Sequence, residues 1–478
     1  MKITIKGATK VYKGNKKKNI ADVYALNNLD LEVESGELFG ILGPSGCGKS
    51  SLLYALSGLK PCDKGEILFD DENVTQLSPD KRDIGFVFQD YALYPNLTVY
   101  ENIRFPLIGV KIRTIKVDEK INRRKLILKI LTNKNTLHNY IEEIEALRMN
   151  HHEEIAELSH YYGVAFSVAQ EIYEIYEKAF NNSTKYQHII SHYEHELNRE
   201  LGRVLQFGYE LGENGVLLKK GDVVPEHRKL TADEIDLRIR KVAKMVNIEH
   251  ILERKPDELS GGEQQRVAIA RAIIFKPKVL LFDEPLSNLD ATLRLQTREQ
   301  IKKIQRETGI TTIFVTHDQD EAMAICDRIA VMKDGKVVAV GAPQDLYDNP
   351  PSLFVAKFIG VPPVLTFNGR IDKKTLSVGG QKLAILKKSR NEDVIIAIRP
   401  EAFYLANNKT STTLEFEVAS VSKYGKDMIA EISLPGEEKT QKIFFETKRG
   451  LSVGTHKLAI NKEKIFVYTL FGERISLE

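Results

Sequence analysis

Residues 43–51 read Gly43-Pro44-Ser45-Gly46-Cys47-Gly48-Lys49-Ser50-Ser51, and this stretch decides how the rest of the chain is interpreted. An apolar run that predicts a buried strand, Leu38–Leu42, precedes it, and Leu52–Leu56, which predicts a helix, follows. A glycine-rich turn between strand and helix lets successive backbone N–H groups surround a phosphate at the positive end of the helix. A glycine-rich turn that binds nothing would not need a strand directly before it and a helix directly after it. The stretch therefore predicts a nucleotide site, with Lys49 on the β- and γ-phosphates and Ser50 on Mg²⁺.

Length and composition narrow the class of protein. The chain has 478 residues, of which 42% are hydrophobic and 28% charged, as in globular proteins of about three domains. A net charge of +3 argues against a general nucleic-acid binder. Three scattered cysteines favour a reducing cytosol, and the N-terminus lacks a signal-peptide pattern. No run of about 18 apolar residues predicts a membrane span. We therefore expect any link to a membrane to go through a partner.

Polar side chains end three further apolar runs. Gln89 ends the first, Asp283 and Glu284 end the second, and His317 ends the third. Taken singly, each has a plainer explanation, such as capping a turn. In parallel sheets, however, ligands bind outside the carboxyl ends of the strands. Asp283 can hold Mg²⁺ there, and Glu284 can polarise the water that attacks the γ-phosphorus.

A second anion site is predicted at Ser260-Gly261-Gly262, where another helix begins. Ser260 and Glu263 fit a capping box, which alone explains these two residues. It does not explain two glycines, which leave no side chain to obstruct a ligand. If this loop meets the phosphate loop of a second chain, nucleotide lies between the two chains.

Residues 111–232 differ from the rest in composition. They contain no proline between Pro106 and Pro225, and they hold eight of the eleven histidines. Apolar residues recur at helical spacing, which predicts two to four helices, the first of them long, with a turn at 181–184. His188, His192 and His195 share helical spacing, but no carboxylate or cysteine pattern completes a metal site.

Other segments are simpler to interpret. Residues 233–252 predict an amphipathic helix, and the lysines at 16–18 predict a solvated loop. From about residue 365 the pattern changes to short alternating runs with Gly and Asn turns, after Pro362-Pro363. This pattern predicts an all-β domain, a small barrel or a sandwich.

Together these motifs resemble the ATP-binding subunits of ABC transporters, of the importer type with a C-terminal regulatory domain. The resemblance covers residues 1–110 and 233–360 and, more loosely, the β segment. It implies an α/β P-loop NTPase core with a helical subdomain, enlarged by an α-helical insertion, and a C-terminal all-β barrel-like (OB-like) domain. The implied parts are a first core part (1–110), the insertion (111–232), a second core part (233–360) and a regulatory domain (361–478).

Site residues follow from the resemblance position by position. The implied catalytic residues are Glu284, His317 and Gln89, and Mg²⁺ would be held by Ser50, Gln89 and Asp283. Asp290 would couple two sites across a dimer. The implied nucleotide contacts are Tyr12 on the adenine, Gly43, Pro44, Ser45, Gly46, Cys47, Gly48, Lys49, Ser50 and Ser51 on the phosphates, and Ser260, Gly261, Gly262 and Glu263 on the other chain's nucleotide. The chain departs from the family's pattern at two of these positions, in each case by a small change. Ser51 stands where threonine is commoner, and Glu263 stands where glutamine often stands.

The resemblance also implies a function. ATP and Mg²⁺ would be the cofactors of a peripheral ATPase at the cytoplasmic face of the membrane. Its partners would be a permease, a solute-binding protein and a second ATPase copy, with no nucleic acid.

Residues 88–95, 358–363 and 398–401 resemble sugar and glycerol-phosphate importers most, and polyamine importers remain an alternative. A non-transport ATPase of the DNA-maintenance type also places helices between phosphate loop and signature, but lacks the β domain. Translation-associated ATPases usually carry two nucleotide-binding halves, whereas one phosphate loop occurs here. The 111–232 insertion would be either a decoration or a docking arm for the permease.

Overall fold

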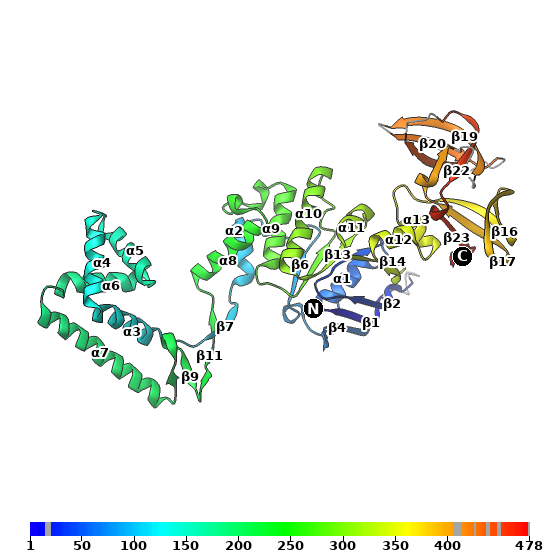
Figure 1. The fold of residues 1–478 in the computed structure, drawn as a ribbon. Coiled ribbons are helices and arrows are strands. Elements are labelled where there is room, and N and C mark those ends of the chain that lie inside the picture. Colours follow the sequence, from blue (N-terminus) through cyan, green and yellow to red (C-terminus); the bar gives the residue numbers. More distant parts are fainter. Residues whose placement is uncertain (15–20, 406–412, 425–426, 436–439, 447–450, 477–478) are drawn as a thin grey trace. The chain divides into compact units, whose positions relative to one another are not determined.

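The computed structural model describes residues 1–14, 21–405, 413–424, 427–435, 440–446 and 451–476 (Figure 1). The lysine loop expected at 16–18 lies outside these ranges. The chain divides into two compact units, residues 1–108 with 233–478, and residues 109–232. The finer division expected at residue 360 stays a prediction.

A six-stranded sheet forms the centre of the first unit, in the order β15-β14-β3-β13-β12-β6. Its strands are β3 (Leu38–Leu42), β6 (Ile84–Val87), β12 (Val279–Asp283), β13 (Thr311–Thr316), β14 (Arg328–Lys333) and β15 (Lys336–Gly341). β15 pairs antiparallel to β14, and the other neighbours pair parallel. Every residue of β3, β12 and β13 is buried, as expected for strands covered on both faces. The carboxyl ends of β3, β6, β12 and β13 therefore meet at one edge, as the sequence predicted.

A second sheet shares its core with the first. It runs in the order β2-β1-β4-β5 and consists of β1 (Ile3–Tyr12), β2 (Val23–Val33), β4 (Lys64–Phe69) and β5 (Glu72–Asn73). Helix α1 (Lys49–Ser57) contributes Leu52 and Leu56 to the cluster that includes residues of both sheets. The buried Arg82 donates to the carbonyls of Ala55 and Leu56 at 2.8 Å each, which fixes the end of α1.

Among the described residues, seven other α-helices belong mainly to this unit: α2 (Val99–Arg104), α8 (Ala232–Met245), α9 (Gly261–Ile273), α10 (Ala291–Thr308), α11 (Gln319–Ile325), α12 (Pro343–Asp348) and α13 (Leu353–Phe358). The helix predicted over 233–252 ends at Met245, earlier than expected. Asn247 takes a left-handed φ of 59°, which breaks the helix, and Glu249–Ile251 form a separate 3₁₀ turn.

The C-terminal segment consists of two antiparallel sheets. One contains β16 (Leu365–Val378), β17 (Gln381–Ile398), β23 (Ile465–Thr469) and β24 (Arg474–Ile475), and the other β18 (Phe403–Leu405), β22 (Gly454–Ile460), β19 (Thr413–Tyr424), β20 (Asp427–Ser433) and β21 (Gln441–Glu446). Phe367, Ile396, Phe416 and Ile432 belong to one core built from both sheets.

Arg399 joins the β segment to the end of the preceding helices. Its buried guanidinium donates to the carbonyls of Tyr347 (2.6 Å), Ala356 (3.3 Å) and Ile359, and it lies 3.9 Å from the Tyr347 ring centroid. Gly360, with φ 114°, lies so close that a Cβ there would be 2.5 Å from Arg399 Nη1. The motif at 398–401 therefore has a structural role as an anchor.

The second unit corrects the helix prediction for 111–232. This fully traced segment contains five helices, α3 (Glu119–Thr132), α4 (Lys134–Ala146), α5 (His151–Tyr162), α6 (Phe166–Ala179) and α7 (Ser183–Gln206), and the longest is the last. The expected long first helix is divided at Asn133, whose φ/ψ of −87°/55° is not helical. Asn150 begins α5 with a capping box, and Gly163 ends it with φ 60°. The predicted turn at 181–184 is present, since Asn182 caps α7.

Strands that the sequence did not predict begin and end this unit. β7 (Lys111–Ile115) pairs antiparallel with β11 (Pro225–Lys229), with Lys111 opposite Lys229. The short strands β8 (Glu210–Leu211), β9 (Leu217–Lys219) and β10 (Asp222–Val223) form a second small sheet. The helices share a buried core that includes Ile141, Leu158 and Ile172. The insertion is therefore a folded unit with its own core.

Across the described ranges, none of the helices combines the length and the hydropathy that a membrane span requires. In the same ranges, no three His, Cys, Asp or Glu side chains are grouped so that they could hold a metal ion.

Candidate nucleotide site

The loop between β3 and α1 requires glycine at several positions. Gly46 and Gly48 have φ of 79° and 106°, in the left-handed region that other residues rarely adopt. A Cβ on Gly43 would lie 2.5 Å from the carbonyl oxygen of Met332, and one on Gly48 would lie 2.1 Å from that of Ala25. The loop is thus held open by close backbone packing and presents N–H groups at the start of α1.

Lys49 is almost fully buried in this loop, with 5% of its surface exposed. Its ammonium group donates to the carbonyl oxygens of Gly43 at 2.8 Å and Pro44 at 3.1 Å. The neighbouring Cys47 is also buried, and burial raises the pKa of its thiol. The chain's only fixed side-chain charge within residues 43–51 therefore already lies at the centre of the loop.

Ser50 and Asp283 bring two hard oxygen ligands together. Ser50 Oγ donates to Asp283 Oδ1 at 3.3 Å, which joins the start of α1 to the end of β12. Burial raises the pKa of the Asp283 carboxyl, as does the charge of Glu284, while the Ser50 bond opposes that shift. Tyr54, one turn beyond Ser50, also lies beside Asp283, whose charge adds to the effect of burial in raising the pKa of the phenol. Oxygen donors of this kind suit Mg²⁺, so the residues present fit the ion.

Glu284 and His317 form a second pair at the same edge of the sheet. His317 Nδ1 lies 2.9 Å from Glu284 Oε2, and the side chains are 55% and 20% exposed, respectively. Glu284 has a φ of 45°, unusual for a residue with a side chain, and its N–H donates to Val315 O at 3.0 Å. The turn after β12 therefore directs the carboxylate toward the end of β13.

Gln89 lies in a tightly anchored loop after β6, with its own side chain exposed. Asn288 Nδ2 donates to the Gln89 carbonyl at 3.0 Å. Tyr91 and Ala92 both have positive φ, 61° and 47°, and Arg271 of α9 donates to their carbonyls at 2.9 and 2.7 Å. The backbone around Gln89 is thus tied both to the segment after β12 and to α9.

Ser260 caps helix α9 as expected. Its N–H and hydroxyl donate to Glu263 Oε2 at 2.8 and 2.7 Å, and these bonds lower the pKa of the Glu263 carboxyl. A Cβ on Gly261 would lie 3.3 Å from Leu289 Cδ2, and one on Gly262 3.4 Å from Leu293 Cδ2. These glycines therefore also allow α9 to approach the segment that leads into α10.

Asp290 caps α10 by accepting from the N–H groups of Thr292 and Leu293, both at 3.0 Å. Within the described residues, no hydrogen bond or ion pair links 260–263 or Asp290 to the phosphate loop. The structure places these residues outside the group that converges on Ser50 and Glu284.

Arg294 connects the Asp290 segment to the loop that carries His317. It donates to Leu289 O at 3.0 Å, and its guanidinium lies 3.5 Å from Asp318 Oδ2 and 3.7 Å from Glu321 Oε1. Glu321 is buried and accepts from Thr316 Oγ1 at 2.6 Å. One side chain thus holds both segments next to the site.

Tyr12 lies at the end of β1 and is 40% exposed. The Lys60 ammonium is 5.8 Å from the Tyr12 ring centroid and 5.3 Å from that of Tyr54. Tyr12 is therefore a partly exposed ring with a lysine over it, at the position where the resemblance places the adenine.

Four residues that sequence reasoning did not single out also shape the site: Tyr54, Arg271, Asn288 and Arg294. Tyr54 follows Ser50 by four residues, and Arg294 follows Asp290 by four, so helical spacing could have indicated both. Arg271 and Asn288 contact partners 179 to 199 positions away, and no local signal marks them.

Comparisons with known proteins show the family to which the chain belongs. Residues 26–287 match the family model described as ABC transporter. The Fe(3+) ions import ATP-binding protein FbpC of Fusobacterium nucleatum is 32% identical, covering 97% of this chain and 94% of its own length. The spermidine/putrescine import ATP-binding protein PotA of Mycoplasmopsis synoviae is 32% identical, with coverage of 91% and 89%. The trehalose/maltose import ATP-binding protein MalK of Thermococcus litoralis is 34% identical, with coverage of 81% and 77%. The chain therefore belongs to the ABC transporter family, among the ATP-hydrolysing subunits of import systems, and its cofactors are ATP and Mg²⁺.

Proposed function

We propose that this chain powers solute uptake by closing on ATP together with a second copy and resetting after hydrolysis. The observation that carries this proposal is the meeting of Ser50, Asp283, Glu284 and His317 at one sheet edge. The solute we propose is a sugar or a glycerol phosphate, with a polyamine as the second candidate. Relatives named for trehalose/maltose, sn-glycerol-3-phosphate and spermidine/putrescine import are 32–34% identical to this chain.

Binding would be the task of the loop between β3 and α1. Backbone N–H groups of 43–51 would donate hydrogen bonds to the phosphates. The Lys49 ammonium group would exchange its hydrogen bonds to two carbonyl oxygens for hydrogen bonds to phosphate oxygens. Ser50, Asp283 and the exposed Gln89 would hold the metal. When bound, Mg²⁺ would neutralise the negative charge that develops on the phosphates. Tyr12 would cover the base.

Proton transfer would fall to Glu284. Its carboxylate is fixed by the strained turn after β12 and by the 2.9 Å contact to His317 Nδ1. With Nδ1–H donating to Glu284, the other ring nitrogen, Nε2, keeps its lone pair and can accept a hydrogen bond from the attacking water. Glu284 would accept the proton of that water as general base, while His317 would keep both groups in place.

The second copy would complete the site. The N-terminus of α9 includes the exposed Ser260, the partly buried Gly261 and Glu263, and the buried Gly262. Within the described residues, it makes no hydrogen bond or ion pair with its own phosphate loop. We propose that it binds the nucleotide of the partner copy, and that Asp290 couples the two sites. Helix N-termini with free N–H groups favour anions, which supports this assignment.

A permease and a solute-binding protein would be the other partners, and nucleic acid would not be one. The net charge of +3 supports the last point. We place the protein as a peripheral subunit at the cytoplasmic face of the cell membrane. Affinity purification of the full chain from membranes tests this: a permease that spans the membrane several times should co-purify. Recovery of DNA-associated proteins instead would favour the alternative of a DNA-maintenance ATPase.

The insertion, residues 111–232, we propose to be a docking arm for the permease's cytoplasmic loops. Support comes from its own core and its exposed charged surface, with basic residues before 134 and acidic residues after 142. Because β7 and β11 pair at Lys111 and Lys229, a short Gly-Ser loop can join residues 110 and 230. We expect this deletion to keep ATPase activity and to lose complex assembly. Unchanged assembly and transport would show that the insertion does not dock the permease and is only a structural decoration.

A further inference from the structure

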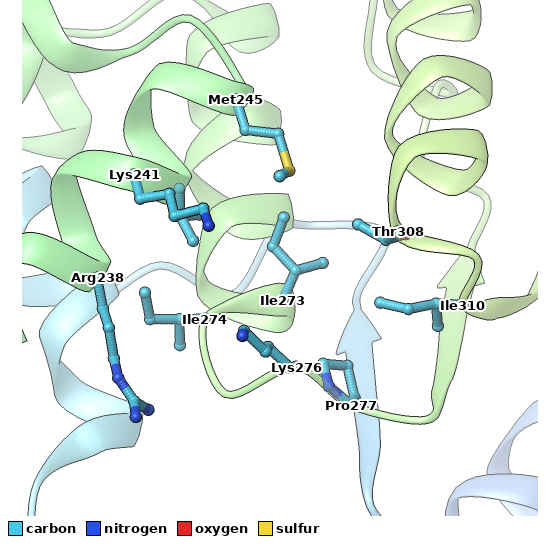
Figure 2. A pocket seen from close by; sticks show the side chains of 10 residues that line it. Arg238, Lys241, Met245, Ile273, Ile274, Lys276, Pro277, Thr308 and Ile310 are labelled. Atoms are coloured by element: carbon cyan, nitrogen blue, oxygen red, sulfur yellow. The ribbon is translucent and has the colours of Figure 1, made fainter.

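A cavity of about 390 Å³ lies among α8, the end of α9, the loop that follows it and the junction of α10 with β13 (Figure 2). Its volume is within the range of small-molecule sites, about 300–1,000 Å³. None of its lining residues belongs to the nucleotide site. It adjoins the amino-terminal ends of β12 and β13, whereas the nucleotide site adjoins their carboxyl ends.

The wall of the cavity is mainly apolar. Val242 and Met245 come from α8, Ile273 is the last residue of α9, Ile274 follows it, and Ile310 directly precedes β13. Val242 and Met245 are only partly buried, so α8 presents a second face besides the stripe of Ile239, Ala243 and Val246 that faces the core. Apolar area left open in a concave site is available for an apolar ligand group.

Three cations surround this apolar wall. Arg238 and Lys241 lie on the same face of α8, and Lys276 lies in the loop after α9 (Figure 2). In the described part of the chain, none of the three makes a side-chain hydrogen bond or an ion pair. This is unlike Arg240 on the same helix, which pairs with Asp236 at 2.8 Å. The cavity therefore combines an apolar wall with uncompensated positive charge at its rim.

Lys276 is held at this rim by an unfavourable backbone conformation. Its φ is 55°, in the left-handed region, and its N–H donates to Ile273 O at 2.9 Å. Glycine or asparagine would adopt this conformation at lower cost than lysine. This turn places the cationic side chain of Lys276 among the residues that line the cavity.

We propose that this cavity binds a small amphipathic anion, a single apolar chain that bears one carboxylate or phosphate head group. The apolar chain would lie against Val242, Ile274 and Ile310, and the head group would meet the ammonium groups of Lys241 and Lys276. Charge complementarity selects an anion over a neutral lipid, and the apolar wall selects an amphiphile over a hydrophilic anion. The site is separate from nucleotide binding and does not depend on which solute is imported.

Isothermal titration of the full-length chain with decanoate, below its micelle concentration, tests the proposal. We expect saturable binding of one decanoate per chain. Decanol, which has the same chain without charge, should bind at least tenfold more weakly, and inorganic phosphate, which the loop at 43–51 is proposed to bind, should not displace decanoate. Absence of saturable decanoate binding, or equal affinity for decanol, would overturn the proposal.

Variants locate the site. The double variant Lys241→Gln/Lys276→Gln should weaken decanoate binding at least tenfold, and both side chains are exposed, so the fold should persist. The matched control Lys244→Gln/Lys278→Gln uses the same helix and loop but residues outside the cavity, and it should stay within twofold of the wild type. Val242→Trp should block binding by filling the cavity while leaving every charge in place. Equal loss in the matched control, or retained binding in Val242→Trp, would place the ligand elsewhere and refute the assignment.

Discussion

Replacing Arg294 by methionine removes the guanidinium that joins the Asp290 segment to the His317 loop and keeps most of the apolar stem. The hydrogen bond to Leu289 O, a bond from a charged donor, is worth about 1.5–3 kcal/mol. Asp318 is 31% exposed, so its ion pair with Arg294 contributes only about 0–1 kcal/mol.

The contact with Glu321 accounts for the rest of the expected loss of folding free energy. Its side chain is 4% exposed, and Arg294 is its nearest cation, 3.7 Å away. Removing one partner of a buried pair costs about 3–5 kcal/mol at close contact. The Arg294–Glu321 contact is long, and Thr316 remains as a hydrogen-bond donor to Glu321, so we expect a cost at the lower end of this range. With non-additivity, the net loss is about 3 kcal/mol, equivalent to a population change of about a hundredfold.

The catalytic consequence should be specific. The His317 loop and Asp290 lose their common tether, whereas residues 43–51 are untouched. We expect kcat for ATP hydrolysis to fall at least tenfold and KM for ATP to change less than threefold. Arg294→Lys should restore part of kcat, because an ammonium can still meet Glu321.

The effect of pH has a defined sign. Burial raises the pKa of Glu321 above its ordinary value, and loss of Arg294 raises it further. A carboxyl whose folded-state pKa lies above its unfolded value stabilises the fold as pH falls and loses that contribution as pH rises through the folded pKa. The stability deficit of Arg294→Met should therefore be smaller at about pH 5.5 than at about pH 8.

Thermal unfolding at both pH values, with steady-state ATPase kinetics, measures these effects. Arg298→Met is the matched control on the same helix, since Arg298 donates to the exposed segment at Asp320 O and touches no buried carboxylate. A deficit independent of pH, or an unchanged kcat, would show that Arg294 does not hold the loop by charge.

Three further predictions follow from the site and the Arg399 anchor. Glu284→Gln keeps an acceptor for His317 and should lower kcat about 10²–10⁴-fold while a closed dimer accumulates on size-exclusion chromatography with ATP; full hydrolysis would contradict its role as base. Lys49→Ala should weaken ATP affinity in a filter-binding assay and abolish turnover, and wild-type affinity would argue against its contact with phosphate. Gly360→Ala, with φ 114° and a Cβ 2.5 Å from Arg399 Nη1, should lower stability by about 2–3 kcal/mol, and an unchanged Tm would refute this account of the anchor.

Most of the site was predictable because its signals are local. The glycines of 43–51 lie between a strand and a helix, and each of Gln89, Asp283 and His317 ends an apolar run. The rule that parallel strands present ligands at their carboxyl ends then places these residues together. The links that fix the loops were not predictable. Asn288 and Gln89 are 199 positions apart, and nothing near either residue indicates the other.

For the insertion, residues 111–232, the helix boundaries could have been predicted from local signals but the strand pairing could not. Asn133, Asn150 and Gly163 are local breaks that could have been used to count its helices correctly, since each ends or begins a helix. The β7–β11 pair could not be found this way. Residues 225–229 read Pro-Glu-His-Arg-Lys, with no apolar alternation, so their strand conformation comes from pairing with 111–115 rather than from their own sequence.

The position of Lys49 has a consequence for nucleotide affinity. Its ammonium group leaves water when the protein folds, not when ATP arrives, because the carbonyl oxygens of Gly43 and Pro44 already accept hydrogen bonds from it. The desolvation cost of the charge is thus met by the free energy of folding, and the incoming phosphate only exchanges one set of oxygen acceptors for another. Affinity for ATP is consequently tied to the rigidity of the surrounding core. A substitution far from the loop that loosens β3 or α1 will let water reach the ammonium group and weaken binding without touching any ligand contact.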